Sequence, residues 1–430
     1  MRGYRPDEWE KKMNYITARQ YITDAGKYGS VLGLEVITEL MNRLGNPQDN
    51  QYYVHVAGTN GKGSTITYID QILSAAGYKV GKYMSPAVFE YREAFQVEGR
   101  MIEEEVYAQL MTIVARAADK MEEDGFPHPT SFEMETAMAF MFFTQSRCDI
   151  VLLETGMGGE TDATNIIKEN MCSVITSISL DHMRFLGDTV EEIAEVKAGI
   201  IKYGSDVVVT DQKQSVIDVI RSKAEKRNCT FHVGKVDSIR ELSMKGVYQQ
   251  NNAATAKKVV EVLISKGYTG IIRDTIDCID DGLANAYISG RFEKINDEPE
   301  IIIDGAHNPG AVTRLKDTLE LYFTNKKITF IMGVLSDKDY NTEAGILFDN
   351  NSRIITVTTP GIRGLSAEEL ADTLQKYSDN VVTSDSIYEA VKMAAEDVKQ
   401  NNSDVIVAFG SLSYLGELRK VVKEEYYANR

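Results

Sequence analysis

The stretch VHVAGTNGKGST, residues 54–65, joins an apolar run to a glycine-rich loop, one lysine and two hydroxyl residues. It departs from the Walker A pattern twice, because Val56 stands where the first glycine belongs and Lys62 is followed by another glycine. The glycines at 58, 61 and 63 allow positive φ and close backbone approach, so successive N–H groups can face an anion. Lys62 adds a positive charge. The stretch therefore predicts a phosphate-binding loop directly after a strand.

The residues after this loop predict a helix. Apolar residues recur there at helical spacing, after Ser64 and Thr65, at Ile66, Ile69, Leu73 and Ala76. The positive end of such a helix points at the phosphate. An ordinary glycine-rich turn between a strand and a helix is the alternative, and the lysine and hydroxyls at the helix start favour the phosphate site.

Length and composition are those of a globular protein. With 430 residues, of which 43% are hydrophobic, the chain can form two or three domains with real cores. The longest apolar runs, such as AMAFMFF at 137–143, fall far short of the ~20 residues of a membrane span. The N-terminal stretch MRGYRPDEWEKKMNY is charged and lacks the apolar region of a secretion signal. We therefore expect a cytoplasmic protein with no membrane partner.

Cysteine spacing and net charge exclude further classes. The four cysteines, at 148, 172, 229 and 278, are far apart and show no CxxC pair, so neither a zinc site nor a disulfide framework is indicated. The formal net charge of −17 argues against nucleic acid as a partner, because phosphate backbones bind basic surfaces. Anionic small substrates remain compatible with this charge if positive groups gather in a cleft.

From about residue 50 onward, short β-rich runs alternate with helical stretches, which predicts a parallel sheet with helical crossovers. A long helical stretch is expected near 103–123, and further helices are expected at 132–146 and 189–201. The composition becomes polar over 286–299, AYISGRFEKINDEP, where we expect a linker, and the alternation then restarts. The predicted fold class is α/β, with an N-terminal P-loop ATPase domain and mostly parallel sheet (1–290) and a smaller C-terminal Rossmann-like domain (297–430).

Polar residues follow several of the predicted strands. In open parallel sheets the ligand crevice lies beyond the carboxyl ends of the strands, and Ser85, Glu154 and His182 fall at such ends, as the loop does. A hydroxyl, a carboxylate and an imidazole beside a triphosphate suit Mg²⁺, which shares its coordination shell with water and phosphate. Taken singly, Glu154 could cap a helix and His182 could be a core histidine. Their coincidence at one edge favours the metal site.

Lys197 is ambiguous from its surroundings. In the stretch VEEIAEVKAGIIK it shares a helix with Ile193 and Ile200, so its stem could run along buried surface. A solvated lysine on a helix is the ordinary alternative, and the residues alone do not exclude it.

Ten motifs occur in order along the chain: GTNGKGS (58–64), SP (85–86), FEMETAMAF (132–140), ETGMGGETDATN (154–165), SLDHMRFLGDTVEEIAEVKAGIIK (179–202), YQQNNAATA (248–256), SGRFE (289–293), DGAHNPG (304–310), SDKD (336–339) and FGSL (409–412). Together they resemble the folylpolyglutamate synthase/dihydrofolate synthase family of the Mur ligase superfamily. The resemblance runs from about residue 20 to the C-terminus. No single motif would be specific, but their order is.

The resemblance implies a reaction that couples ATP cleavage to amide formation. ATP would phosphorylate a carboxylate of dihydropteroate or a folate, and the amine of L-glutamate would attack the acyl phosphate. The nucleotide-binding residues implied in the loop are Gly58, Thr59, Asn60, Gly61, Lys62, Gly63 and Ser64. Two magnesium ions are implied, and their shells would include Ser64, Ser85, Glu154, His182 and Lys197. Lys197 matches the family lysine that is carbamylated, which turns a cation into a metal-binding carboxylate.

The remaining site residues implied by the resemblance lie later in the chain. Asn252 and Arg291 match residues at the nucleotide, Asp304 and His307 match groups of the second domain that close on the site, and Ser411 matches a serine near the incoming glutamate. A strand-end carboxylate and a turn histidine are the plain alternatives for Asp304 and His307. Because DGAHNPG directly follows the strand EIIID, its place at a carboxyl edge agrees with the functional interpretation. The implied catalytic residues are Lys62, His182, Lys197, Arg291 and His307.

Three positions depart from the family pattern. Ala87 stands where many relatives have His or Tyr, Glu93 and Ala94 stand where they have Glu-Arg, and Glu160 stands where they often have Arg or an apolar residue. In the family these positions lie on the pterin or folate side, so they bear on substrate preference and not on the use of ATP.

Two other functions compete with this one. A Mur-type ligase that adds an amino acid to a cell-wall nucleotide precursor is disfavoured by FEMETAMAF and by the lack of an extra N-terminal nucleotide-sugar domain. A nucleotide switch without enzyme activity would not need Glu154, His182, Lys197 and DGAHNPG together. We expect a monomer that binds only small molecules: ATP, L-glutamate and a folate or dihydropteroate.

Overall fold

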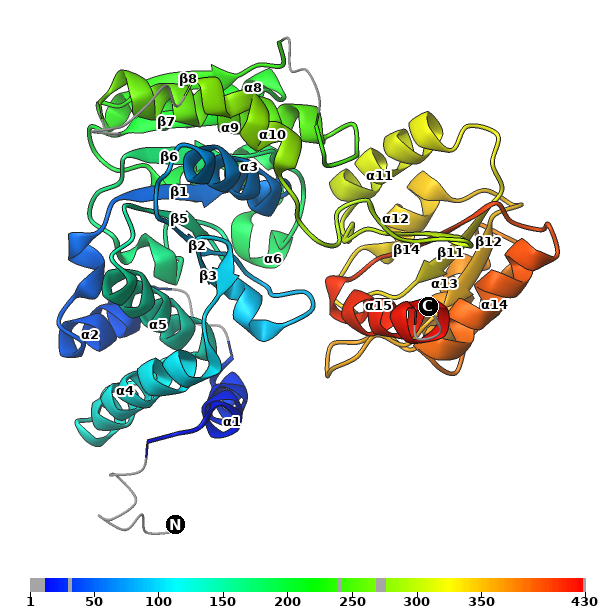
Figure 1. The fold of residues 1–430 in the computed structure, drawn as a ribbon, viewed down its shortest axis with the longest axis horizontal. Helices are drawn as coiled ribbons and strands as arrows, with labels where there is room; N and C mark the ends of the chain where they lie inside the picture. Colours follow the sequence, from blue (N-terminus) through cyan, green and yellow to red (C-terminus); the bar gives the residue numbers. More distant parts are fainter. Residues whose placement is uncertain (1–11, 30–32, 238–241, 268–275, 428–430) are drawn as a thin grey trace.

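The structure is a computed structural model, which describes residues 12–29, 33–237, 242–267 and 276–427. The described chain forms two α/β units, each built on its own sheet, and the units lie side by side (Figure 1). Most of the charged N-terminal stretch examined above lies outside the described residues. Within the described part, no helix combines the length and the apolar character needed to cross a membrane.

Within the described residues, the first sheet has eight strands in the order β4-β3-β2-β5-β1-β6-β7-β8. Its strands are β1 Tyr53–Ala57, β2 Val80–Tyr83, β3 Phe95–Val97, β4 Arg100–Met101, β5 Ile150–Glu154, β6 Cys172–Ile175, β7 Asp206–Thr210 and β8 Thr230–Gly234. The pairs β2–β3 and β3–β4 are antiparallel and the others are parallel, as the alternating pattern predicts. β1 lies between β5 and β6, where the chain changes the direction in which it adds strands. The loop after β1 therefore opens at a topological switch point, where such sheets bind ligands.

Helices cover both faces of this sheet (Figure 1). They are α1 Tyr15–Ala25, α2 Glu35–Arg43, α3 Lys62–Ala75, α4 Glu104–Glu123, α5 Ser131–Ser146, α6 Met183–Leu186, α7 Val190–Lys197, α8 Gln214–Lys226, α9 Gln249–Ser265 and α10 Asp277–Asn285. Short 3₁₀ turns are η2 Gly26–Tyr28, η3 Pro47–Asn50, η4 Tyr91–Ala94, η5 Ala163–Ile166 and η6 Ala198–Ile200. Alternate residues of β5 point to opposite sides: Leu152 joins the core under α3, α9 and α10, and Leu153 joins the core under α4 and α5. Both faces are buried, which explains why the strands are continuous apolar runs.

The second sheet has six strands in the described residues, in the order β13-β12-β11-β14-β10-β9. Its strands are β9 Glu293–Asp297, β10 Glu300–Ile303, β11 Ile328–Met332, β12 Arg353–Thr356, β13 Val381–Thr383 and β14 Val405–Phe409. Its helices are α11 Pro309–Tyr322, α12 Tyr340–Leu347, α13 Ala367–Leu374, α14 Ile387–Lys399 and α15 Leu412–Tyr427. Two apolar cores, one on each face of the sheet, hold this unit together.

Two expectations about local structure need correction. The polar stretch 286–299 was expected to be a linker, but Glu293–Asp297 within it forms β9, an antiparallel strand at the edge of the second sheet. Charged residues are common on edge strands because they discourage further pairing, so a polar composition does not exclude a strand. The helix expected over 189–201 ends as an α-helix at Lys197 and continues as the turn η6 to Ile200.

Candidate active site

The loop after β1 has the backbone shape that its glycines permit. Gly58 and Gly61 have φ of +155° and +88°, and a Cβ atom at either position would collide with Thr176 or Asn252. The N–H groups of Thr59 and Asn60 donate to the carbonyl of residue 177 at 2.9 and 3.2 Å, which anchors the loop to the chain after β6. The loop N–H groups left for an anion are therefore those at the start of α3, where a helix leaves its first donors free.

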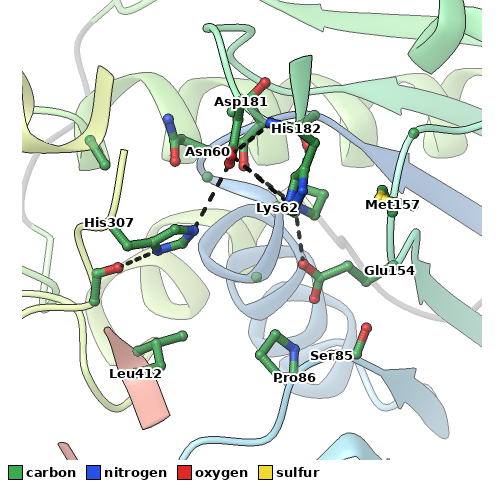
Figure 2. Close-up of a pocket in the computed structure, with 18 of the residues that line it drawn as sticks. Asn60, Lys62, Ser85, Pro86, Glu154, Met157, Asp181, His182, His307 and Leu412 are labelled. Atoms are coloured by element: carbon green, nitrogen blue, oxygen red, sulfur yellow. Dashed lines mark hydrogen bonds and ion pairs between the residues drawn. The ribbon is translucent and has the colours of Figure 1, made fainter. Parts of the chain in front are cut away.

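Lys62 folds back over this loop. Its Nζ donates to the carbonyl oxygens of Gly58 and Thr59 at 3.2 and 3.4 Å and lies 3.7 Å from Oε1 of Glu154 (Figure 2). Carbonyl oxygens are weak partners for an ammonium group compared with a phosphate. The lysine is thus held near the helix start in a position from which it can turn toward an anion.

Glu154, at the end of β5, is a buried carboxylate whose side chain is 8% exposed. Burial raises the pKa of this carboxyl, while the charges of Lys62 and Arg291 and a backbone hydrogen bond from Ser85 oppose the rise. It lies at the cavity and not at the start of a helix, so the capping alternative does not describe it. A buried carboxylate with its nearest cation at 3.7 Å is suited to receive a further positive charge.

Lys197 is buried, with 5% of its surface exposed, so the solvated alternative is wrong. Its Nζ donates to the Gly58 carbonyl at 2.9 Å, the same oxygen that accepts from Lys62. Burial and the nearby charge of Lys62 lower the pKa of Lys197 to about 7. Ile193 and Ile200 beside it are fully buried, as the helical spacing predicts.

His182 lies at the cavity and not in a core. It has a left-handed backbone, with φ of +50°, and burial lowers the pKa of its imidazole. Its Nε2 lies 3.9 Å from Oδ1 of the neighbouring Asp181, a residue that the sequence analysis did not select.

Asp181 connects the two units. Its carboxylate accepts from Nζ of Lys338 at 2.9 Å and from Nδ2 of Asn308 at 3.2 Å, and Nε2 of His307 lies 4.0 Å away. Burial raises the pKa of this carboxyl, but Lys338 and the two histidines outweigh that and hold it at about 2. Asp181, Asn308 and Lys338 stand in the motifs SLDHM, DGAHNPG and SDKD, so their motifs could have singled them out even though their pairing could not be read.

A second bridge joins the loop directly to the second unit. The side-chain amides of Asn60 and Asn308 exchange two hydrogen bonds of 3.1 Å each, although the residues are 248 positions apart. Asn60 also donates to the hydroxyl of Ser179. Asn308 caps α11, whose start therefore sits against the phosphate-binding loop.

The second unit contributes residues that already have partners. Asp304 accepts hydrogen bonds from the Tyr248 hydroxyl at 3.0 Å and from the backbone N–H groups of Phe292 and Ala306 at 2.7 and 2.8 Å. The hydroxyl of Ser411 lies 2.6 Å from that of Ser413. Asp304 is thus fully bonded, which the sequence could not show.

His307 is held as a neutral ring. Its Nδ1 lies 2.8 Å from the carbonyl of Gly305, which can only accept, so Nδ1 carries the proton and Nε2 is left as an acceptor. Burial and the charge of Lys338 lower the pKa of His307 to about 4. Beside it, Nη1 of Arg291 bonds the Gly290 carbonyl at 3.3 Å and occupies the space that a side chain at Gly305 would need.

Asn252 and Ser64 belong to one hydrogen-bond chain. Asn252 faces Gly61 and donates to Gln249 at 3.0 Å, and Gln249 donates to the Ser64 hydroxyl at 3.3 Å. Gln249 stands in YQQNNAATA but was not selected, since an amide inside a helix has no distinctive signal.

One cavity of about 1060 Å³ brings the predicted site residues together. It is lined by every predicted site residue: Gly58, Thr59, Asn60, Gly61, Lys62, Gly63, Ser64, Ser85, Glu154, His182, Lys197, Asn252, Arg291, Asp304, His307 and Ser411. Figure 2 shows Lys62, Glu154, His182 and His307 around this space. The roles assigned to them stay predictions, but their convergence from both units is a property of the fold.

The expected magnesium ligands fit a particular kind of metal site. Among the described residues, no three His, Cys, Asp or Glu side chains are grouped so as to hold a metal ion. Glu154 supplies one buried carboxylate and Ser64 one hydroxyl, which suits Mg²⁺ only when phosphate and water complete the shell. The donor set therefore fits a metal that arrives with a nucleotide.

Comparisons with known proteins agree with this geometry. Residues 56–268 match the family model of the Mur ligase middle domain, and residues 290–412 match that of the Mur ligase, glutamate ligase domain. A dihydrofolate synthase/folylpolyglutamate synthase of Bacillus subtilis (strain 168) is 32% identical over 434 residues, covering 95% of this chain and 99% of that protein.

Solved structures show the same likeness. A folylpolyglutamate synthase of Mycobacterium tuberculosis, complexed with ADP and AMPPCP, has a TM-score of 0.84 at 26% identity over 96% of this chain and 99% of that one. The E. coli FolC protein in complex with DHPP and ADP has a TM-score of 0.79 at 28% identity over 95% and 98% of the two chains.

Proposed function

The chain belongs to the folylpolyglutamate synthase/dihydrofolate synthase family, and from that premise we propose that it joins L-glutamate to the carboxylate of a folate or dihydropteroate in a reaction driven by ATP. The observation that carries the proposal is the single cavity in which the loop after β1, with Lys62 and Glu154, faces His307 and Ser411 of the second unit. A ligase of this kind needs both sides, because one must activate a carboxylate and the other must deliver an amine.

The first half of the reaction is a charge problem. An oxygen of the substrate carboxylate attacks the γ-phosphorus of ATP, the bond to ADP breaks, and an acyl phosphate forms. Two anions approach each other, so Lys62 and Arg291, both on the cavity, offset the repulsion and hold the phosphate in line. Magnesium, when bound with the nucleotide near Glu154, would neutralise further phosphate charge.

In the second half, the amine of glutamate attacks the acyl carbon, and phosphate leaves with the oxygen that came from the carboxylate. His307 presents an unprotonated Nε2 to the cavity, which can accept a hydrogen bond from the amine and orient it. Ser411 lies on the same side and is assigned to the incoming glutamate. Water must be kept from the acyl phosphate, and the bridges from Asn60 and Asp181 to the second unit hold the cavity together for that purpose.

We also assign carbamylation to Lys197. With a pKa of about 7, much of its amine is unprotonated near neutral pH and can attack CO₂, which gives a carbamate and releases a proton. The product is an anion buried near Glu154, where a second Mg²⁺ would stabilise it.

We further propose that the division between the two domains falls within 286–299, before β9, and that the protein acts as a cytoplasmic monomer.

The experiment compares substrates. Release of ADP and phosphate is measured with dihydropteroate or with tetrahydrofolate, each with and without glutamate, and products are identified by mass. The proposal predicts turnover only when both the carboxylate substrate and glutamate are present, with a product one glutamyl unit heavier. A Mur-type ligase would turn over neither folate, and a nucleotide switch would hydrolyse ATP slowly without either substrate.

A further inference from the structure

The cavity extends from Glu154 along the start of α5, where two glutamates line it. Glu133 is occupied in capping the helix: Oε2 accepts from the backbone N–H and the hydroxyl of Thr130, both at 2.8 Å. Glu135, two residues further along α5, also lines the cavity and has neither a hydrogen bond nor an ion pair with any residue that the structure describes. The two carboxyls that line the cavity at the start of α5 therefore differ, because that of Glu133 caps the helix and that of Glu135 is free to bond a ligand.

Aromatic side chains line the same cavity as Glu135. They include Tyr91 and Phe132, which stands three residues before Glu135 on α5, and the ring of Phe132 packs against Gly156, two residues after Glu154. The guanidinium of Arg19 lies over the Tyr91 ring and forms no ion pair with Glu135. An aromatic ring with a polar group nearby suits a flat heterocycle that lies along the ring and bonds through its edge.

Burial makes this carboxyl an unusual partner. It raises the pKa of Glu135 to about 8, and the charge of Arg19 opposes the rise. At neutral pH the side chain is therefore mostly a neutral acid, which offers one O–H donor beside one carbonyl acceptor. Glutamine has the same shape and the same pair of groups.

The proposed substrates carry a ring that matches this pair. A folate or dihydropteroate reacts through a carboxylate at one end and carries a 2-amino-4-oxopyrimidine ring at the other, with donor and acceptor atoms side by side on its edges. When the reacting carboxylate faces the phosphate held at Lys62, the rest of the molecule can extend along the cavity past Phe132 toward Glu135. We propose that Glu135 is a specificity-determining residue that accepts from the 2-amino group of this ring and donates to the ring nitrogen N1 beside it, an inference that rests on the proposed function.

The test uses two variants and two substrates. Glu135→Leu removes both hydrogen-bonding groups, and Glu135→Gln keeps them. Each variant is assayed with dihydropteroate and with an analogue in which a methyl group replaces the 2-amino group, and KM and kcat are determined separately. Glu133→Gln is the matched control, because that carboxyl lines the same cavity but serves the helix cap.

The proposal expects the wild type to prefer dihydropteroate by at least about 10-fold in kcat/KM, as a bonded group left without its partner costs that much or more. In Glu135→Leu, KM for dihydropteroate should rise by about 10- to 100-fold and the preference should vanish, while kcat and the KM for ATP change little. Glu135→Gln should keep both affinity and preference, and Glu133→Gln should keep the preference while it lowers thermal stability.

A folding defect would be recognised separately. Glu135→Leu removes a carboxyl that has no partner in the described chain, so its thermal midpoint should equal or exceed that of the wild type. Retention of the wild-type preference in Glu135→Leu would overturn the proposal, and a Glu135→Gln variant as weak as Glu135→Leu would contradict bonding by the neutral acid. If the wild type formed no amide from dihydropteroate or any reduced folate, the proposed function itself would fail, and this inference with it.

Discussion

The carboxyl edges of the two sheets meet at one cavity but differ in how their polar groups are satisfied. At the first edge, Glu154 is a buried carboxylate with a raised pKa, Lys197 is a buried amine with a lowered pKa, and Lys62 bonds mainly to carbonyls. At the second edge, Asp304 accepts three hydrogen bonds and His307 is fixed in one tautomer by a carbonyl.

This difference indicates that the polar groups of the two edges have different roles. Charged groups that the fold leaves with few partners raise the free energy of the protein. A ligand that supplies the missing partner offsets this cost. Groups that are already bonded set the geometry against which the ligand is placed. Substitutions at the first edge should therefore change the stability of the protein little but lower its activity. Substitutions at the second edge should change turnover more than nucleotide binding.

The largest effect is expected for Lys62→Ala. Kcat/KM for ligation should fall by about 1000-fold or more, since a cation aimed at the transferred phosphate is lost. The unfolding midpoint should hardly move, because Lys62 contacts carbonyl oxygens of its own loop and one carboxylate. Phosphate release and urea unfolding measure the two quantities. Ligation at the wild-type rate would refute the assignment of the loop.

Substitution of Lys197 should cost somewhat less. Lys197→Ala is expected to lose about 100-fold in kcat, and millimolar formate or acetate should restore part of it by supplying a carboxylate. Lys197→Arg keeps a positive charge that cannot be carbamylated, so it should be no better than the alanine variant.

The pKa of Lys197 adds a pH signature to this prediction. Because the amine loses its proton near pH 7 in the folded protein, stimulation by a fixed concentration of dissolved CO₂ should grow as pH rises through about 7. Full activity of Lys197→Arg, or activity indifferent to CO₂, would count against the carbamate.

His307→Ala tests the second edge. Turnover should fall by about 10- to 100-fold, because the amine loses an oriented acceptor, while the Kd for ATP stays within about threefold. Equilibrium binding of a nucleotide analogue is measured beside kcat. A loss of nucleotide affinity as large as the loss of turnover would show that the two edges do not divide the work.

Much of this division was predictable from the sequence, for reasons that differ between residues. Lys62 stands in a local pattern of loop and helix, and Glu154 follows an apolar strand, so chain order and parallel topology sufficed to place both. The burial of Lys197 depends on how α7 packs, and the helical spacing allowed either outcome. The pairs Asp181–Lys338 and Asn60–Asn308 join residues 157 and 248 positions apart, which no local pattern encodes. Glu135 was not selected because it stands in the motif FEMETAMAF, whose apolar pattern predicts a buried helix and gives no sign of a ligand site.

The smallest effect concerns stability in the second unit, where Glu343, unlike Asp304, is a buried carboxyl without hydrogen-bond partners among the described residues. It is 1% exposed, neither carboxyl oxygen has a partner among the described residues, and burial raises its pKa to about 8 against the nearby charge of Lys338. Folding must then take up a proton between the ordinary glutamate pKa and about 8, so stability should fall as pH rises through that window.

Glu343→Gln should remove this slope. Relative to the wild type, the variant should gain on the order of 1–3 kcal/mol in unfolding free energy near pH 8 and little near pH 5. Urea unfolding at both pH values measures the gain. An equal change at both would mean that Glu343 is ionised and paired in the folded protein.

The central claim is that this cavity activates a carboxylate by transferring phosphate to it, and oxygen isotopes test that most directly. Dihydropteroate whose carboxylate carries oxygen-18 is converted with ATP and glutamate, and the released phosphate is analysed by mass. An acyl phosphate intermediate predicts that each phosphate contains one labelled oxygen, because the carboxylate oxygen stays on phosphorus when the amine displaces it. Phosphate without label, formed alongside the amide product, would contradict the account.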